Sequence, residues 1–219
     1  MSLRAEKGSG STPVGGWRAM VDVASDASVA ATYLVAWIAP AWVGGERGVA
    51  TLVGLMVLEF VVIHSSAFLG SAALAGKMSR ENLKAVLGFG LLYLVFALGI
   101  AIGFKNPWFL VGFVGLHANR LVPVLLGRGV SSVDGAAWMG RWAFGAIFYL
   151  GSTFATVLLP VPHLGVRFSL HGYGSGAWID DPERALAMGF LYYSAQALLG
   201  VAIARRGRSP RVEGNQLKF

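Results

Sequence analysis

Long apolar stretches alternate with short polar segments along the whole chain. A helix needs roughly 20 residues to cross a hydrocarbon core of about 30 Å, and six stretches approach or exceed that length. They cover residues 28–44, 49–73, 84–104, 107–127, 137–160 and 184–204. The pattern predicts an all-α fold: a polytopic membrane helix bundle with six transmembrane helices and both termini on one side of the membrane.

Local signals fix several of the expected helix ends. The segment 180–183, with the sequence DDPE, offers a cap residue, a proline at the first helical position and an acid in the first turn. We therefore expect the last helix to begin there. Asn106 and Pro107 open the fourth stretch in the same way, whereas Pro40 interrupts the first stretch and makes it the weakest of the set.

The segments around the predicted helices are polar. Residues 1–27 are expected to form a cytoplasmic tail, in which residues 16–27, GWRAMVDVASDA, carry apolar positions at helical spacing and predict an amphipathic interfacial helix. Residues 28–204 form the transmembrane domain, and residues 205–219 form a basic cytoplasmic tail. The loop at residues 161–182 is rich in glycine and proline, so irregular structure is expected there.

Positive charge is unevenly distributed about the predicted bundle. Of the 18 Lys and Arg residues, 13 fall on the side of the termini and 4 on the opposite side, while Arg120 lies inside a span. Because Lys and Arg concentrate in cytoplasmic loops, both termini are predicted to be cytoplasmic. The net charge of +7 then indicates contact with anionic lipid rather than with nucleic acid.

Composition agrees with a membrane protein. Hydrophobic residues make up 55% of the chain and charged residues 13%, against about 25% charged residues in an average soluble domain. The chain has no cysteine, which excludes disulfides, thiolate metal sites and thiol nucleophiles. Small residues recur four apart at Gly99 and Gly103 and at Gly151 and Ala155, a pattern that lets helices approach closely, within one chain or between chains.

Polar side chains interrupt two of the apolar stretches, LEFVVIHSSAFLG at residues 58–70 and WFLVGFVGLHANRLVPVLL at residues 108–126. Ionisable groups inside a bilayer are costly, so they are expected to pair or to face protein or water. These stretches predict one buried polar cluster, formed by Glu59, His64, Ser66, His117, Asn119 and Arg120.

Depth in the membrane selects the partners within this cluster. At about 1.5 Å per residue, Glu59 lies roughly 15 Å, His117 roughly 14 Å and Arg120 roughly 18 Å below the outer ends of their spans. The sequence therefore predicts a Glu59–Arg120 ion pair, with His117 or His64 as further hydrogen-bond partners. Alternatively, Arg120 extends to the cytoplasmic interface. An internal pair would serve either to fix helix registry or to line a proton or ligand path.

The sequence predicts no enzymatic activity, cofactor or metal. Ser65 and Ser66 have no base and acid at a recognisable spacing, and we expect them to bond backbone carbonyls instead. His64 and His117 differ by roughly 8 Å in depth, which fits poorly with axial ligation of one haem. His163 and His171 share a loop with acidic residues, so either a divalent cation site or ordinary surface polarity is open there.

The segments LEFVVIHSSAFLG and DDPERALAMGFLYYSAQALL together resemble uncharacterised bacterial multi-spanning membrane proteins, a family of unknown function with a Glu and a His-Ser pair on an early helix. The resemblance implies a multi-pass protein of the bacterial cytoplasmic (inner) membrane. It carries no catalytic residue to this chain.

Two functions fit these features. The first is a non-catalytic accessory or structural subunit that packs against other membrane subunits, such as those of a respiratory or photosynthetic energy-transducing complex, because the loops are short and no cofactor motif occurs. The second is a small-solute or proton-linked transporter or channel, in which Glu59, His64, His117 and Arg120 form a polar path. The lack of an internal sequence repeat weighs against the second function.

Overall fold

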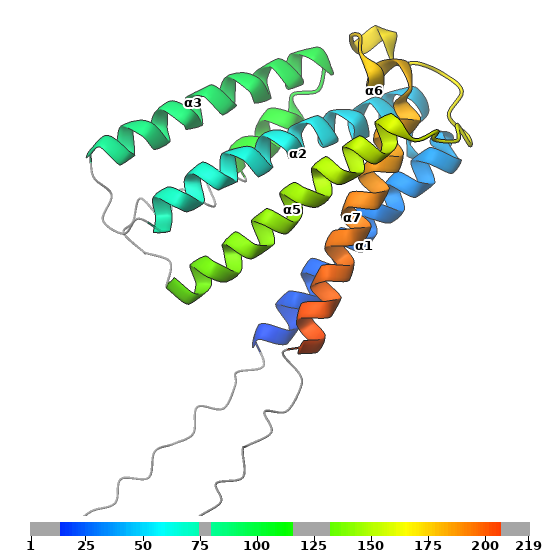
Figure 1. Cartoon of the computed structure of the whole chain (residues 1–219). Helices are drawn as coiled ribbons and strands as arrows, with labels where there is room; N and C mark the ends of the chain where they lie inside the picture. Colours follow the sequence, from blue (N-terminus) through cyan, green and yellow to red (C-terminus); the bar gives the residue numbers. More distant parts are fainter. Residues whose placement is uncertain (1–13, 75–79, 116–131, 207–219) are drawn as a thin grey trace, which may run out of the picture.

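The computed structural model describes residues 14–74, 80–115 and 132–206 (Figure 1). Within these ranges every regular element is a helix, as predicted. The long helices are α1 (Val14–Ile38), α2 (Gly45–Leu74), α3 (Arg80–Gly103), α5 (Ser132–Leu158) and α7 (Pro182–Arg206). The shorter ones are η1 (Pro40–Val43), η2 (His171–Tyr173), α6 (Ala177–Asp180) and a helix that covers residues 108–115 of the described chain.

Three of the described helices contain segments long and apolar enough to cross a membrane. These segments are Met20–Ile38 in α1, Gly45–Ser65 in α2 and Pro182–Arg205 in α7, and α3 adds a shorter apolar segment, Leu87–Gly103. The helices support the predicted class, a helical membrane protein. The number of six crossings and the side of the termini stay predictions, and part of the fourth expected span lies outside the described residues.

The helix ends follow the local signals at α7 and near residue 108, whereas α1 differs from the predicted first stretch, residues 28–44, at both ends. Helix α7 begins at Pro182, as the DDPE segment predicts, and the side chain of Asn106 accepts a hydrogen bond of 3.1 Å from the backbone N–H of Trp108 at the start of the next helix. Helix α1 is longer than expected at its N-terminal end, because residues 16–27 continue into the first apolar stretch without a break. It ends before Pro40, which has no backbone N–H to donate.

Helices α1 and α7 form an antiparallel pair, and α2 and α5 pack against α7 (Figure 1). The close approach of α1 and α7 depends on Gly189, since a Cβ atom there would lie 2.5 Å from the ring of Tyr33. Tyr33 is fully buried at this crossing. Helix α3 packs on the far side of α2, where Phe109 and Phe113 complete a second apolar cluster.

Helix α2 is held by aromatic side chains that donate to its backbone. Three such hydrogen bonds run from Tyr33 Oη to the carbonyl of Leu52 (2.9 Å), from Tyr149 Oη to that of Met56 (2.7 Å) and from Trp142 Nε1 to that of Ile63 (2.8 Å). Positions 52, 56 and 63 follow a spacing of four and seven, so they share one face of α2. Position 59 lies on the same face, which directs Glu59 toward α1, α5 and α7.

The segment between α5 and α7 covers one end of the bundle, shown in yellow in Figure 1. Trp37 at the end of α1 holds it twice: its Nε1 donates to the carbonyl of Pro162 at 2.8 Å, and its own carbonyl accepts from the N–H of Gly165 at 3.0 Å. Lys105 Nζ donates to the carbonyl of Gly172 at 3.2 Å. We call this segment, residues 159–181, the cap. As predicted, most of it is irregular.

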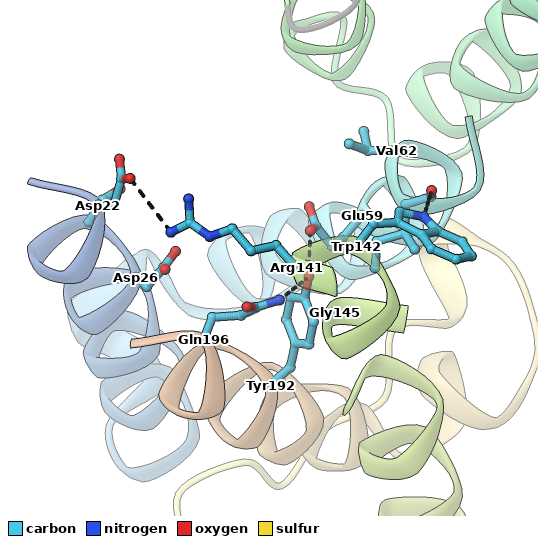
Figure 2. Close-up of a pocket in the computed structure, with 11 residues that line it drawn as sticks. Asp22, Asp26, Glu59, Val62, Arg141, Trp142, Gly145, Tyr192 and Gln196 are labelled. Atoms are coloured by element: carbon cyan, nitrogen blue, oxygen red, sulfur yellow. Dashed lines mark hydrogen bonds and ion pairs between the residues drawn. The ribbon is translucent and has the colours of Figure 1, made fainter. Parts of the chain in front are cut away.

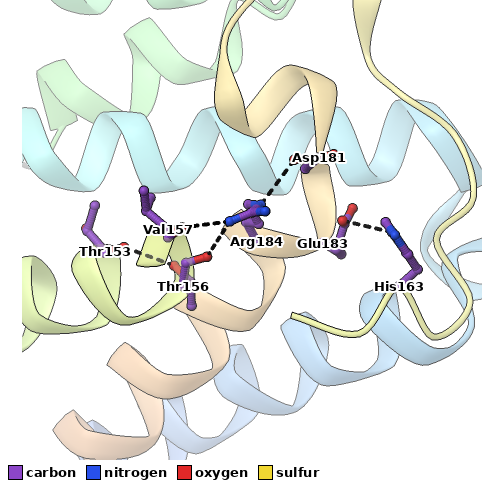
Figure 3. Close-up of polar contacts among 7 residues, drawn as sticks. All are labelled: Thr153, Thr156, Val157, His163, Asp181, Glu183 and Arg184. Carbon is purple, nitrogen blue, oxygen red and sulfur yellow. Dashed lines mark hydrogen bonds and ion pairs between the residues drawn. The ribbon is translucent and has the colours of Figure 1, made fainter. Parts of the chain in front are cut away.

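Arg184 and Glu183 join the cap end of the bundle to α7 (Figure 3). The guanidinium of Arg184 donates to the carbonyls of Thr156 and Val157 at 3.1 and 2.8 Å, and to the carboxylate of Asp181 at 3.1 Å. The last carbonyls of a helix have no partner within the helix, so Arg184 caps α5. The buried Glu183 pairs with Nδ1 of His163 at 2.8 Å.

Candidate functional site

A cavity of about 350 Å³ lies between α1, α2, α5 and α7 (Figure 2). Its lining residues lie from the middle of these helices toward the ends where α1 and α5 begin and α7 ends. That is the half of the bundle away from the cap (Figure 1). Its lining residues are Asp22, Ser25, Asp26, Glu59, Val62, Ile63, Arg141, Trp142, Gly145, Tyr192 and Gln196.

Glu59 is held at the inner side of this cavity by a hydrogen-bonded chain. The hydroxyl of Tyr192, on α7, donates to Oε1 of Glu59 at 2.9 Å, and Nε2 of Gln196 donates to that hydroxyl at 3.2 Å. Tyr192 is buried, and its ring packs edge-on against Tyr149 with ring centroids 5.6 Å apart. The carboxylate of Glu59 therefore has a fixed position within an apolar segment of α2.

Charged groups stand at the outer side of the cavity. Asp22 and Asp26 occupy positions four apart on α1, so both lie on one face of that helix. Arg141, in the first half of α5, extends toward them, and its Nη2 lies 3.9 Å from the Asp22 carboxylate (Figure 2). Both side chains of this pair are more than half exposed. Solvent screening makes such a pair weak, about 0–1 kcal/mol.

The remaining walls are apolar or neutral. Val62 and Ile63 of α2 line the cavity together with Trp142 of α5, and the Nε1 hydrogen bond of Trp142 to the Ile63 carbonyl fixes its ring. Gly145 lines the α5 side, and a Cβ atom there would lie 3.0 Å from Nε2 of Gln196. A larger residue at position 145 would thus push Gln196 away from α5. The cavity thus has charged groups at its outer side, and at its inner side aromatic and aliphatic walls surround the carboxylate of Glu59.

The structure brings only part of the predicted polar cluster to this cavity. Glu59 lines it, but His64 does not: its Nδ1 lies 2.9 Å from the carbonyl of Phe60, and its ring packs on the Phe60 ring. Ser65 bonds the carbonyl of Val62 at 3.1 Å, as predicted. The structure does not describe the other members of the predicted cluster, which are His117, Asn119, Arg120 and the side chain of Ser66. The Glu59–Arg120 pair therefore stays a prediction.

Several cavity residues do not belong to the predicted polar cluster. Asp22 and Asp26 belong to the segment predicted to form an interfacial helix, and Arg141 is one of the 13 basic residues predicted to lie on the side of the termini. Tyr192 and Gln196 lie four apart within the last apolar stretch, and this spacing of polar groups is the signal that could have found them.

The cap contains a second cavity, of about 540 Å³, but its residues do not form the cation site considered above. His163 pairs with Glu183, whereas His171 pairs with Asp180 at 3.4 Å. Across the described parts of the chain, no three His, Asp or Glu side chains are placed to hold a metal ion. The two histidines therefore take part in separate pairs that tie down the cap.

The glycines of the two small-residue patterns lie on the outer surface of the described helices. Gly99, Gly103 and Gly151 are exposed, and a Cβ atom added at any of them would meet no described atom within 4 Å. They face away from the described helices rather than mediating contacts between them. Close approach inside the chain depends on Gly189 instead.

Comparison of the chain with protein-family models, with curated proteins and with solved structures gives no match. The resemblance to a bacterial membrane-protein family therefore has no support from these comparisons, and the site has to be interpreted from its own geometry.

Proposed function

We propose that this protein is a multi-pass membrane transporter or channel that binds a small solute in the cavity between α1, α2, α5 and α7. The observation that carries the proposal is the position of Glu59: it lies within the apolar segment Gly45–Ser65 and lines a cavity together with Asp22, Asp26 and Arg141. A carboxylate at this depth is costly unless it meets a polar partner or a water-accessible space. A binding cavity provides such a space.

The proposal implies a movement of the helices. Between the cavity and the cap the bundle is packed with buried side chains, including Tyr33, Met56 and Leu186. A solute that enters beside Glu59 can reach the cap end only when this layer separates. The α1–α7 pair is the natural moving unit, because these two helices share the most extensive contact in the described chain.

The membrane arrangement belongs to the same proposal. With six crossings and cytoplasmic termini in a bacterial inner membrane, the cavity would open to the cytoplasm and the cap would face the opposite side. The basic residues near the predicted termini support this orientation.

The accessory-subunit function has no comparable observation. Helix α3 exposes large apolar side chains such as Leu91, Phe96 and Ile102, but this surface suits lipid and a partner subunit equally. Native mass measurement after mild detergent extraction separates the two functions, because an accessory subunit would carry foreign subunits in fixed proportion.

Uptake into proteoliposomes tests the transport function. Purified protein is reconstituted and exposed to a defined mixture of small amines, sugars, carboxylates and amino acids, and internal solutes are quantified by mass spectrometry. We expect at least one solute to enter faster than into protein-free liposomes, and Glu59→Gln to reduce that rate at least tenfold. Glu46→Gln, an exposed acid at the start of α2, is the matched control. Uptake equal to that of empty liposomes would refute transport.

A further inference from the structure

We propose that the cavity selects a small organic cation, a protonated amine that carries a compact apolar group. This inference rests on the proposed function and names its class of solute. Its three bases are the balance of charge in the lining, the size of the cavity and the apolar walls.

The charged lining favours a cation. Among the described residues that line the cavity there are three carboxylates, those of Asp22, Asp26 and Glu59, and one guanidinium, that of Arg141. A concave site with walls of low dielectric concentrates the field of such groups, which attracts solutes of opposite sign and repels those of the same sign. An anionic solute would meet this excess of carboxylates, and a neutral solute would gain nothing from it.

The size of the cavity favours an organic cation over a bare ion. A volume of about 350 Å³ is at the small end of the range of about 300–1,000 Å³ for pockets that bind organic molecules. A metal ion instead needs several ligands converging on one point, and the described residues contain no such group of His, Asp and Glu. The space suits an amine with a ring or a short branched chain.

The walls set the orientation of the bound amine. Val62, Ile63 and the Trp142 indole form an apolar surface, against which the hydrocarbon part of the solute would lie. The ammonium group would then face Glu59, whose carboxylate is fixed by the 2.9 Å hydrogen bond from Tyr192. Asp26 of α1, which lines another wall of the cavity, supplies the second negative charge.

Arg141 gives the proposal a distinctive consequence. It is the one cation among the described lining residues, and its 3.9 Å pair with Asp22 leaves both side chains largely in solvent. Replacing it with a neutral residue removes a positive charge from the cavity. The substitution should therefore tighten the binding of an amine, an effect that structural damage would not produce.

Binding of isosteric solutes tests this inference. Benzylamine and cyclohexylamine at neutral pH are compared with the corresponding alcohols and carboxylates by isothermal titration calorimetry, using protein in nanodiscs of zwitterionic lipid and empty nanodiscs as blanks. We expect each amine to bind at least tenfold more tightly than its alcohol or carboxylate. Asp26→Asn should weaken amine binding about tenfold, Arg141→Gln should strengthen it about threefold, and Glu46→Gln should leave it unchanged.

The outcomes separate this inference from the proposed function. If an alcohol or carboxylate binds as tightly as its amine, or if Arg141→Gln weakens amine binding in protein that stays monodisperse, the cationic class is wrong while transport of another solute remains measurable in the uptake assay. If no solute of any class binds and uptake equals that of empty liposomes, the proposed function fails together with this inference.

Discussion

Tyr149 on α5 donates a hydrogen bond of 2.7 Å from its hydroxyl to the backbone carbonyl of Met56 on α2. Both residues are buried in the main apolar cluster. A buried hydroxyl without a partner is costly, and in this packed layer the backbone of a neighbouring helix supplies the acceptor. The bond therefore links α5 to α2 one helical turn from Glu59, on the same face of α2.

We expect Tyr149→Phe to lower the free energy of unfolding by about 1 kcal/mol, the usual net value of one hydrogen bond in proteins, including membrane proteins. Because phenylalanine retains the ring, the loss of unfolding free energy reports the contribution of the hydroxyl alone. Thermal unfolding in a mild detergent, followed by tryptophan fluorescence, measures the change. Tyr173→Phe in the cap is the control, since the Tyr173 ring makes the contacts to Phe104 and Lys105. Equal loss in both variants would contradict a specific role for Tyr149.

The crossing of α1 and α7 makes a second prediction. In Gly189→Ala the new methyl group would lie 2.5 Å from the Tyr33 ring, so the helices must separate, at a cost of about 1–3 kcal/mol for overpacking. Gly99→Ala is the matched control, because Gly99 faces open space on α3 and alanine favours a helix by up to about 1 kcal/mol. The two variants should shift the unfolding temperature in opposite directions. A Gly189→Ala protein as stable as the wild type would show that α1 and α7 do not pack as described.

The positions of the helices could be predicted from the sequence, because the length of an apolar stretch and the residues at its ends are local properties. Pro182 after two aspartates marks the start of α7 as predicted. The first stretch was expected to continue to residue 44, whereas α1 ends at Ile38 and the short helix η1 follows from Pro40. Residues 16–27 were expected to be separate from the first span, and they instead continue into it as one helix. Asp22 and Asp26 made the segment look too polar for a span, although polar groups that face a cavity are compatible with a continuing helix.

The site itself could be predicted only in part. Glu59 could be predicted as a site residue because a charge in hydrocarbon is costly. Its partner could not be predicted, because the helical rise gives only the depth of a residue, and many residues on other helices lie at the same depth. Its observed partner, Tyr192, is 133 positions away in the chain. Which helices are neighbours depends on packing details such as the contact of Gly189 with Tyr33, and a single sequence does not reveal these. Arg141 was missed for the same reason.

Arg184 provides a third prediction, at the cap end. Its guanidinium spans the last carbonyls of α5 and the carboxylate of Asp181, and hydrogen bonds that involve a charged group contribute about 1.5–3 kcal/mol. Arg184→Ala should lower the free energy of unfolding by about that amount. Arg184→Lys should recover only part of it, because an ammonium lacks the planar fork of donors.

The control for Arg184 is Arg167→Ala, which removes an exposed arginine from the neighbouring cap and should leave the unfolding temperature nearly unchanged. Hydrogen exchange supplies a second measurement. Without the contacts of Arg184, the backbone amides in the last turn of α5 should exchange their hydrogens faster, while those in the middle of that helix stay protected. Complete recovery of stability by lysine would contradict the forked geometry of the contact.

The predicted orientation in the membrane gives the last prediction, and the absence of cysteine in the chain makes it simple to test. Ser175→Cys places a thiol on the exposed part of the cap, and Arg205→Cys places one near the end of α7. If the termini are cytoplasmic, a membrane-impermeant maleimide should label the cap cysteine in intact cells and the Arg205→Cys protein only after the cells are permeabilised. Uptake by each variant checks that the protein is folded. Labelling in the reverse pattern would invert the orientation, and the cavity beside Glu59 would then open to the outside. Equal labelling of both sites in intact cells would place both ends of α7 on the same side and exclude α7 as a membrane-spanning helix.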